Sequence, residues 1–123
     1  MVLVDTSVWV EHLQRGSSEL AGLLQRAQVL SHPYVVGELA LGSLQQRATI
    51  LEALQNLPQA CVASAEEVLG FIGIHALNGL GIGYVDACLL ASVRLTPGGV
   101  LWTLDKRLAA AATRLGVAAG LLH

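Results

Sequence analysis

The feature that most constrains the fold of this chain is the alternation of short apolar segments with longer helical ones. Residues 1–5 (MVLVD) carry apolar side chains without polar alternation, as a strand buried on both faces does. Further strand-like segments occur at 29–31, 60–63 and 100–103, and a last short one at 117–119. Strands separated by helices are typical of an α/β fold with a mainly parallel sheet covered on both faces. The order of the strands stays open.

Capping residues, proline and glycine set the expected helix boundaries. Ser64 and Glu67 have the spacing of a capping box, which predicts a helix from there towards Asn78. Residues 79–83 (GLGIG) predict a loop and 96–99 (TPGG) a turn. The other expected helices start at Thr6 or Ser7, at Ser18, at Pro33, at Gln46, at Tyr84 and at Asp105, and they end near residues 15, 27, 45, 57, 95 and 115.

Length and composition narrow the class of protein. A chain of 123 residues fits one domain, spanning residues 1–123. With 54% hydrophobic and 13% charged residues, it is too apolar for a disordered protein or a long coiled coil. The formal charge of −2 excludes a strongly basic protein that wraps nucleic acid. Any nucleic acid has to be held by a local basic patch or through bound cations.

The apolar composition raises the question of a membrane span. Residues 68–85 contain no formal charge, but His75 and Asn78 lie near the middle and five glycines interrupt the segment, which argues against a spanning helix. No basic leader precedes the first apolar segment. Cys61 and Cys88 form no CxxC pair, so both are expected to be reduced core residues. We therefore expect a cytoplasmic protein with no membrane partner.

Isolated acids mark the candidate site. Within residues 27–46 Glu38 is the only charged residue, and within 68–104 the only ones are Asp86 and Arg94. On its expected helix Asp86 shares a face with apolar residues three, four and seven positions later, whereas Arg94 lies on another side. Because burying an unpaired carboxylate costs several kcal/mol, such residues need a cation, hydrogen bonds or a proton.

The remaining two aspartates complete the pattern. Asp5 and Asp105 each follow a predicted strand, at the edge where open α/β sheets bind ligands. Four carboxylates in one crevice repel one another, and a hard divalent cation such as Mg²⁺ or Mn²⁺ resolves that conflict. Each acid also has a simpler interpretation. Asp5 and Asp105 suit helix N-caps, Glu38 a partly exposed position, and Asp86 a favourable place near its helix N-terminus.

Four segments of the sequence closely resemble the PIN-domain endoribonucleases. They are VDTSVWVEHL, HPYVVGELALGSL, GIGYVDACLLAS and LWTLDKRLAAAA, in the order and with the usual spacing of that family. More narrowly, they are similar to the toxin subunits of VapBC-type toxin–antitoxin modules. The resemblance runs from residue 2 to about residue 117. It implies a three-layer α/β/α sandwich with a short, mainly parallel central sheet.

The resemblance also assigns roles to residues. It implies that Asp5, Glu38, Asp86 and Asp105 form the catalytic acidic cluster that binds Mg²⁺ or Mn²⁺. Ser7 and Thr103 match small hydroxyl residues that support the first and last acids. Some members carry a further acid shortly after the fourth position, where this chain has Lys106 and Arg107, which puts a fully occupied second metal site in doubt.

The chemistry implied is metal-dependent hydrolysis of an RNA phosphodiester bond. The family further implies a cognate antitoxin that covers the acidic site, and a homodimer of the toxin. Cations at the rim of the crevice are candidates for guiding RNA. These are Arg15, Arg47, Arg94, Lys106 and Arg107.

Two other functions are compatible with parts of the pattern. One is a catalytically inactive PIN-like module that binds nucleic acid or protein, although all four acids are present. The other is a phosphatase of the haloacid-dehalogenase type with Asp5 as nucleophile. Such enzymes have a second aspartate two residues later, and here that residue is Ser7.

Overall fold

The structure is a computed structural model that describes residues 1–120. Within them, three short strands form one sheet and seven helices surround it. The strands are β1 (Val2–Val4), β2 (Val29–Leu30) and β3 (Val100–Trp102). The helices are α1 (Thr6–Arg15), α2 (Ser18–Gln25), α3 (Pro33–Ala40), α4 (Arg47–Gln55), α5 (Ala65–Ile74), α6 (Tyr84–Leu95) and α7 (Lys106–Arg114).

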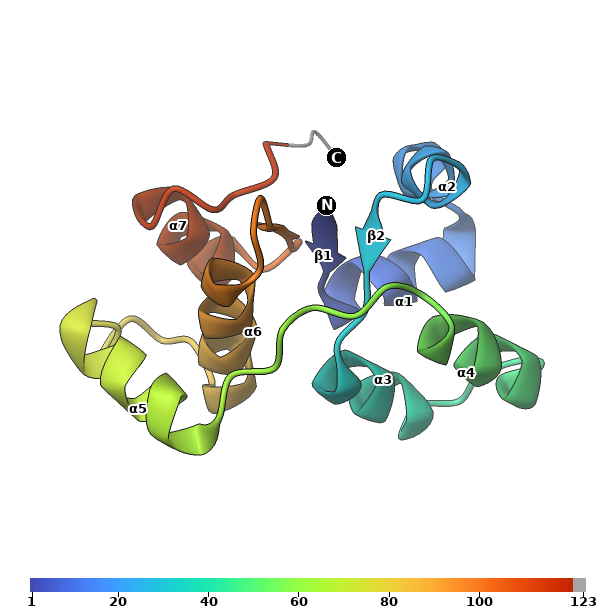
Figure 1. Ribbon diagram of the computed structural model, residues 1–123. Helices are drawn as coiled ribbons and strands as arrows, with labels where there is room; N and C mark the ends of the chain where they lie inside the picture. Colours follow the sequence, from blue (N-terminus) through green and yellow to red (C-terminus); the bar gives the residue numbers. More distant parts are fainter. Residues whose placement is uncertain (121–123) are drawn as a thin grey trace.

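The sheet is parallel and has the order β2-β1-β3. Val2 pairs with Val29 on one side and with Val100 on the other, so β1 is the central strand. Figure 1 shows α5, α6 and α7 to one side of the strands and α1 to α4 to the other. The sheet therefore lies between two groups of helices, as expected for a three-layer sandwich.

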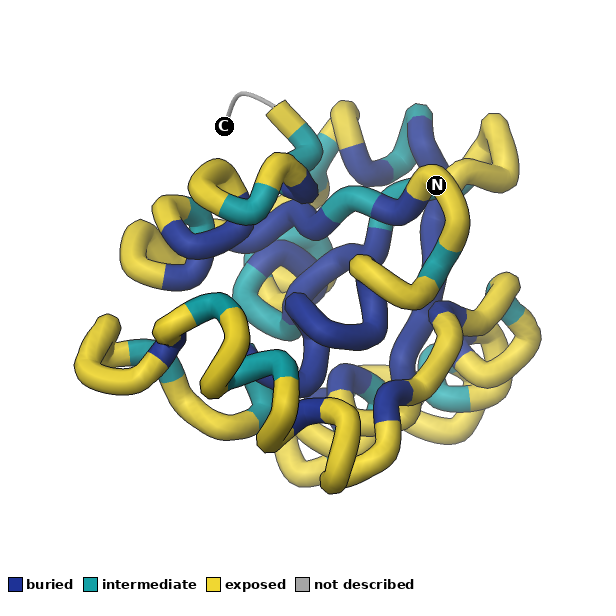
Figure 2. Tube along the Cα trace, turned by 60° about the vertical axis from the view of Figure 1, so that its left-hand side comes forward, coloured by how far each residue is buried: buried dark blue, intermediate teal, exposed yellow. Residues whose placement is uncertain are grey.

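The core follows from the apolar segments of the sequence. Leu3 and Val4 of β1 are fully buried, and β1 has a neighbour on each edge. Helix α6 is buried from Ala87 through Val93, because it packs against β3 on one side and α5 on the other. Figure 2 shows the buried segments gathered at the centre of the molecule and exposed turns around them. Asp86, one residue before this buried stretch, thus lies where the core meets the surface.

One expected strand is wrong. Residues 60–63 form no strand, and the nearest pairing is an isolated bridge between Ser31 and Gln59. The backbone N–H groups of Cys61 and Ala63 donate instead to the side chains of Thr96 and Ser92, at 3.0 and 3.2 Å. Side-chain acceptors thus replace the neighbouring strand that the apolar composition suggested.

Smaller differences concern the ends of elements. Residues 117–119 contribute only an isolated bridge, between Leu101 and Ala118. The helix expected to extend towards residue 45 ends at Ala40, and Ser17 rather than Ser18 caps α2. Of the two cysteines, both expected in the core, Cys88 is buried and Cys61 is exposed. No helix within residues 1–120 is both long and apolar enough to cross a membrane.

Candidate functional site

Asp5 lies at the carboxyl end of the central strand, immediately before α1. Although it occupies the N-cap position, its side chain makes no capping hydrogen bond. Its Oδ2 atom accepts hydrogen bonds from Ser7 Oγ at 2.8 Å and from Thr103 Oγ1 at 2.7 Å. The residue is only 7% exposed. The carboxylate of Asp5 is therefore held by two hydroxyl groups, and the interpretation of Asp5 as a mere N-cap does not describe its side chain.

The same two hydroxyls fasten the segment that follows β3. The backbone N–H of Leu104 donates to Ser7 Oγ, and that of Asp105 donates to Thr103 Oγ1, both at 3.0 Å. Ser7 and Thr103 thus connect Asp5 to the start of α7. Their geometry fits the supporting positions expected from the sequence.

Asp105 is a true N-cap. Its Oδ1 atom accepts from the backbone N–H groups of Arg107 and Leu108, at 2.9 and 3.0 Å. The residue is exposed, and its side chain agrees with the simpler interpretation of Asp105 as a helix N-cap. Both hydrogen bonds use Oδ1, which leaves Oδ2 without a part in the cap.

Asp86 is held at the start of α6 by the preceding loop. Gly79 and Gly81 have φ angles of +77° and +78°, which favour glycine, and they turn the chain into the helix. The backbone N–H of Gly83 then donates to Asp86 Oδ2 at 3.0 Å. Burial raises the pKa of Asp86, the Gly83 hydrogen bond opposes that rise, and the charges of Asp5, Asp105 and Glu38 add to it. The charges of the other three acids therefore reach Asp86, although these residues are far apart in sequence.

Glu38 reaches the site from the surface. Its isolation from other charges in the sequence favours apolar surroundings, but α3 ends at Ala40 and the next residue, Leu41, is 91% exposed. Glu38 is exposed, and its Oε1 atom accepts a hydrogen bond from Thr6 Oγ1 at 2.6 Å. No sequence signal connects Thr6 with an acid 32 residues later. Sequence reasoning missed this contact.

The donor set fits a hard divalent cation in chemistry. All four side chains offer carboxylate oxygens, which Mg²⁺ and Mn²⁺ prefer. The one ion pair within residues 1–120 joins Arg15 to Glu11, so no basic side chain neutralises the four acids at close range. In the described structure, no three His, Cys, Asp or Glu side chains lie close enough together to hold one metal ion. Glu38 and Asp105 are exposed, and the binding of one ion by all four acids would require these two to move towards Asp5 and Asp86.

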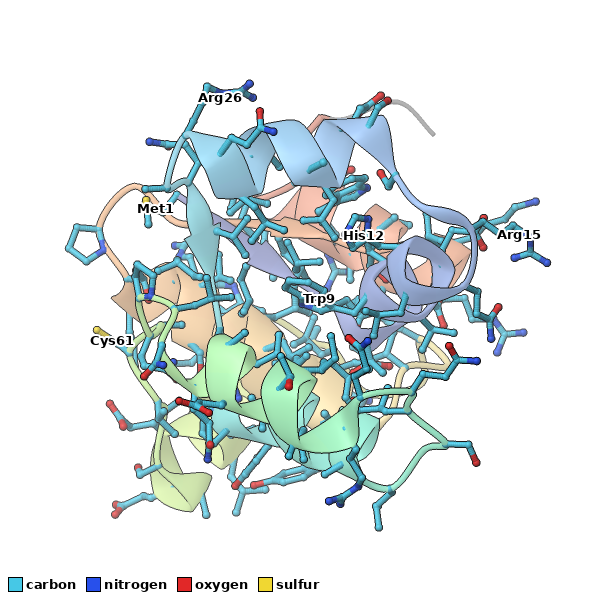
Figure 3. All side chains as sticks on the ribbon, turned by 90° about the vertical axis from the view of Figure 1, so that its right-hand side faces the viewer. Met1, Trp9, His12, Arg15, Arg26 and Cys61 are labelled. Atoms are coloured by element: carbon cyan, nitrogen blue, oxygen red, sulfur yellow. The ribbon has the colours of Figure 1, made fainter. Side chains whose placement is uncertain are left out.

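The expected RNA-guiding cations differ in their surroundings. Arg15 pairs with Glu11 at 2.8 Å, while Arg47 and Arg94 donate to the backbone carbonyls of Ala40 and Leu115 at 2.9 and 3.0 Å. Figure 3 shows Arg15 at the outer edge of the molecule, with Trp9 in the interior. Three of the five candidates thus have protein partners. Lys106 and Arg107 project from the first turn of α7, beside Asp105.

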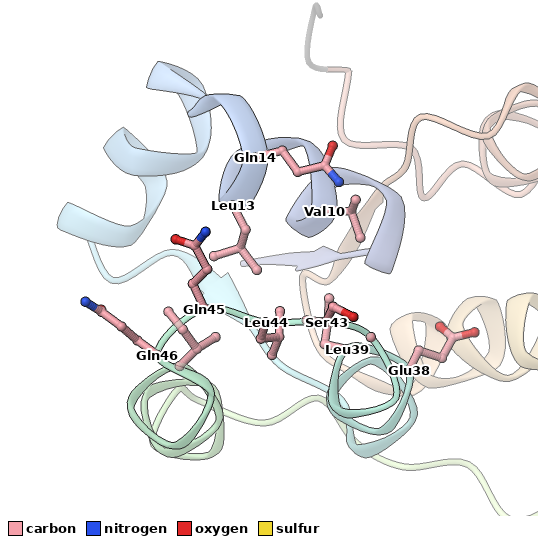
Figure 4. A pocket seen from close by; sticks show the side chains of 11 residues that line it. Val10, Leu13, Gln14, Glu38, Leu39, Ser43, Leu44, Gln45 and Gln46 are labelled. Atoms are coloured by element: carbon pink, nitrogen blue, oxygen red, sulfur yellow. The ribbon is translucent and has the colours of Figure 1, made fainter.

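A pocket of about 770 Å³ opens beside Glu38, between α1 and the connection from α3 to α4. Figure 4 shows Gln14, Gln45 and Leu13 along it and Glu38 at one end. Val10 and Leu13 of its wall are 39% and 37% exposed, so the pocket offers apolar surface next to an acid of the site. Nothing in the sequence pattern predicted it.

Comparison with known proteins agrees with this geometry. The model of the PIN domain family matches residues 2–114. Ribonuclease VapC32 from two strains of Mycobacterium tuberculosis is 51% identical over 118 residues, which cover 96% of this chain and 95% of the relative. On both grounds, the chain belongs to the PIN-domain family.

Proposed function

We propose that this chain is a metal-dependent endoribonuclease, formed by a single domain of residues 1–123, that acts as the toxin of a toxin–antitoxin pair. The observation that carries the proposal is that Asp5, at the carboxyl end of the central strand, and Asp86, at the start of α6, are each held by hydrogen bonds. The charges of Asp5, Asp105 and Glu38 also add to the raised pKa of Asp86. The high identity to a protein named as a ribonuclease of the VapC type supports the same activity. The substrate class is RNA and the bond is its phosphodiester.

The chain's own residues bind and orient in this mechanism. Asp5, Glu38, Asp86 and Asp105 would hold Mg²⁺ or Mn²⁺, which when bound polarises the scissile phosphate and neutralises charge on the leaving oxygen. Ser7 and Thr103 fix the Asp5 carboxylate, and Gly83 fixes that of Asp86. Preorganised carboxylates need little rearrangement during the reaction.

Partners follow from the surfaces around the site. A cognate antitoxin segment that covers the acids would reach the pocket beside Glu38, where Val10 and Leu13 offer apolar contacts. On α5, Leu69 and Ile74 are 64% and 81% exposed, and exposed apolar side chains of this kind suit a toxin homodimer. RNA as substrate supports the expectation that the protein acts in the cytoplasm. The mass of the purified chain in solution measures the dimer directly.

The decisive experiment is RNA cleavage by purified chain freed of antitoxin. We expect Mg²⁺ or Mn²⁺ to support cleavage of total RNA and EDTA to abolish it. Asp5→Asn removes a charged ligand but keeps the shape of the side chain, and it should lower the rate by a factor of at least about 100, the scale of losing one electrostatic contact to a transition state. Glu52→Gln, which removes an exposed acid on α4, is the matched control and should cleave like wild type.

Two results would contradict the proposal. Cleavage that persists in EDTA, or in Asp5→Asn at the wild-type rate, would exclude the metal–acid mechanism. If wild type binds RNA but cleaves none with either metal, the chain is the inactive binding module instead. A phosphatase with Asp5 as nucleophile is disfavoured because Ser7 stands where such enzymes have a second aspartate, and its hydroxyl donates to Asp5 Oδ2.

A further inference from the structure

Arg107 has a guanidinium group with no hydrogen bond or ion pair to any residue among 1–120. In this it differs from most arginines of the chain. The guanidinium groups of four others bind protein oxygens: Arg15 at Glu11, Arg47 at Ala40, Arg94 at Leu115 and Arg114 at His75. Arg26 shares the lack of a partner but lies at the end of α2. Arg107 is therefore the arginine near the acids whose donors are available to a ligand.

The side chain of Arg107 nevertheless packs against one place, Gly81 in the loop before α6, which we call its seat. A Cβ atom added to Gly81 would lie 2.5 Å from Arg107 Nη1 and 3.0 Å from its Cδ. Real Cβ atoms do not approach so closely, so the absence of a side chain at Gly81 is what lets the guanidinium lie there. The φ angle of +78° at Gly81 favours glycine independently.

This seat lies between the segments that carry two of the acids. The backbone N–H of Arg107 donates to Asp105 Oδ1 at 2.9 Å. Gly81 is two residues before Gly83, whose N–H donates to Asp86 Oδ2. Yet no carboxylate lies within 4.0 Å of the Arg107 guanidinium in the described structure. The cation is held beside the acidic cluster without being neutralised by it.

We propose that Arg107, seated on Gly81, binds a phosphate of the RNA adjacent to the one that is cleaved. This inference rests on the proposed function for its substrate class. A planar guanidinium binds phosphate oxygens with two parallel hydrogen bonds. The acidic residues have no donors for a neighbouring phosphate, so a cation beside them is needed to bind it. Gly81 is a positioning residue, because it acts only through the place that it gives to Arg107.

The test measures binding of a fluorescein-labelled single-stranded RNA by anisotropy, in Mg²⁺, with Asp5→Asn present in every variant to prevent cleavage. Arg107→Gln should weaken binding about tenfold or more, the scale of a hydrogen bond to a charged group. The slope of log affinity against log salt should become shallower by about 0.7, the value for one phosphate on a single strand. Arg107→Lys should keep the wild-type slope with intermediate affinity.

Arg26→Gln is the matched control for charge. It removes the same charge from an arginine that also lacks a partner, but at the amino ends of the strands, where Val2 N–H donates to Gln28 and where Figure 3 shows Arg26 on the side of Met1. Binding should change little. Equal losses of RNA affinity in Arg107→Gln and Arg26→Gln would overturn the proposal, because the loss would then come from the change in net charge.

Gly81→Ala tests the seat, and Gly79→Ala is its control for backbone strain. Gly79 has a φ angle of +77°, but a Cβ atom there would meet nothing within 4 Å. Gly81→Ala should weaken RNA binding when Arg107 is present and have no further effect in Arg107→Gln, whereas Gly79→Ala should leave affinity unchanged in both. Thermal unfolding of each variant shows that it is folded. Additive effects of Gly81→Ala and Arg107→Gln would refute the seat.

Cleavage assays on chains with an intact Asp5 distinguish a failure of this inference from a failure of the proposed function. If wild type cleaves RNA with Mn²⁺ and Arg107→Gln binds RNA normally, the endoribonuclease stands and the role of Arg107 is refuted. If wild type cleaves nothing but Arg107→Gln loses affinity and slope as expected, the phosphate site stands and the proposed function fails.

Discussion

At the scale of single residues, the informative contrast is between the partners of Asp5 and those of an ordinary buried carboxylate. Asp5 is 7% exposed, yet the donors to its Oδ2 atom are the neutral hydroxyls of Ser7 and Thr103. Hydroxyl donors stabilise the ionised form without cancelling its charge. A lysine or arginine in their place would satisfy Asp5 equally well but would compete with a bound cation.

Thr103→Val tests this arrangement. The substitution keeps the shape of the side chain and removes the 2.7 Å hydrogen bond to Asp5 Oδ2, as well as the acceptor for Asp105 N–H. We expect the free energy of unfolding in denaturant to fall by about 1–3 kcal/mol, because a buried charged acceptor loses a donor. Thr103→Ser keeps the hydroxyl, so its free energy of unfolding should fall less than that of Thr103→Val. A stability of Thr103→Val equal to that of wild type would show that Asp5 does not depend on this hydroxyl.

At the scale of elements, a buried histidine joins three segments that position the site. His32 is fully buried and caps α3, where its Nδ1 atom accepts from Tyr34 N–H at 3.1 Å. Its Nε2 atom therefore carries the proton and donates to Ser92 Oγ of α6 at 3.1 Å. Ser92 Oγ also accepts from Ala63 N–H. The relative placement of α3, which carries Glu38, and α6 depends on neutral His32.

This junction predicts a pH dependence of stability. Burial lowers the pKa of His32, so below its ordinary value the unfolded chain takes up a proton that the folded chain refuses. The free energy of unfolding should therefore fall as pH decreases from 7.5 to 5.5. His32→Asn keeps an acceptor for Tyr34 N–H and should flatten this dependence while lowering stability overall. Denaturant titrations at the two pH values measure the free energy of unfolding and its pH dependence. If this pH dependence is the same in His32→Asn as in wild type, it does not arise from His32.

Elements with a strong local signal could be predicted from the sequence. The limits of α6, Tyr84 to Leu95, are those expected, because a glycine loop precedes the helix and TPGG follows it. The capping box at Ser64 and Glu67 is also confirmed. The strand predicted at 60–63 was wrong. The apolar residues there suggested a strand, but side chains distant in sequence bind the backbone of this segment. Local pattern cannot report such contacts.

The site shows the same division between local and distant information. That Asp5 ends a strand and Asp86 begins a helix follows from local pattern, and the structure agrees. The exposure of Asp105 agrees with its alternative interpretation as an N-cap, and that of Glu38 with a partly exposed position. Local pattern did not decide between these interpretations and a place in the acidic cluster. The seat of Arg107 on Gly81 joins residues 26 positions apart, and the sequence alone offers no means to find it.

At the scale of the whole molecule, the charges around Asp86 affect how the stability of the fold depends on pH. The pKa of Asp86 is raised, so its ionised form is less favourable in the folded chain than in the unfolded one, and stability falls as pH rises through that interval. A divalent cation bound at the proposed site would offset this penalty.

Thermal unfolding with and without Mn²⁺ tests this balance. Mn²⁺ at a hundred times its dissociation constant should stabilise the wild type by about 2.7 kcal/mol. Asp86→Asn keeps an acceptor for Gly83 N–H but removes the charge, so it should melt at a higher temperature than wild type in EDTA and gain much less from Mn²⁺. Glu52→Gln on α4 should respond as wild type does. An equal Mn²⁺ effect in Asp86→Asn would exclude that residue as a ligand.

The central position of β1 has a consequence for the newly made protein. The first acid ends this strand, but both its hydroxyl partner Thr103 and the last acid, Asp105, arrive with β3, nearly a hundred residues later. A nascent chain therefore carries no complete acidic cluster until translation has passed residue 105. Ribosomes that stall before that codon, and messages cut upstream of it, would release fragments without the proposed nuclease site. In the proposed toxin–antitoxin pair, a cell would therefore have almost the whole time of synthesis in which to supply the antitoxin.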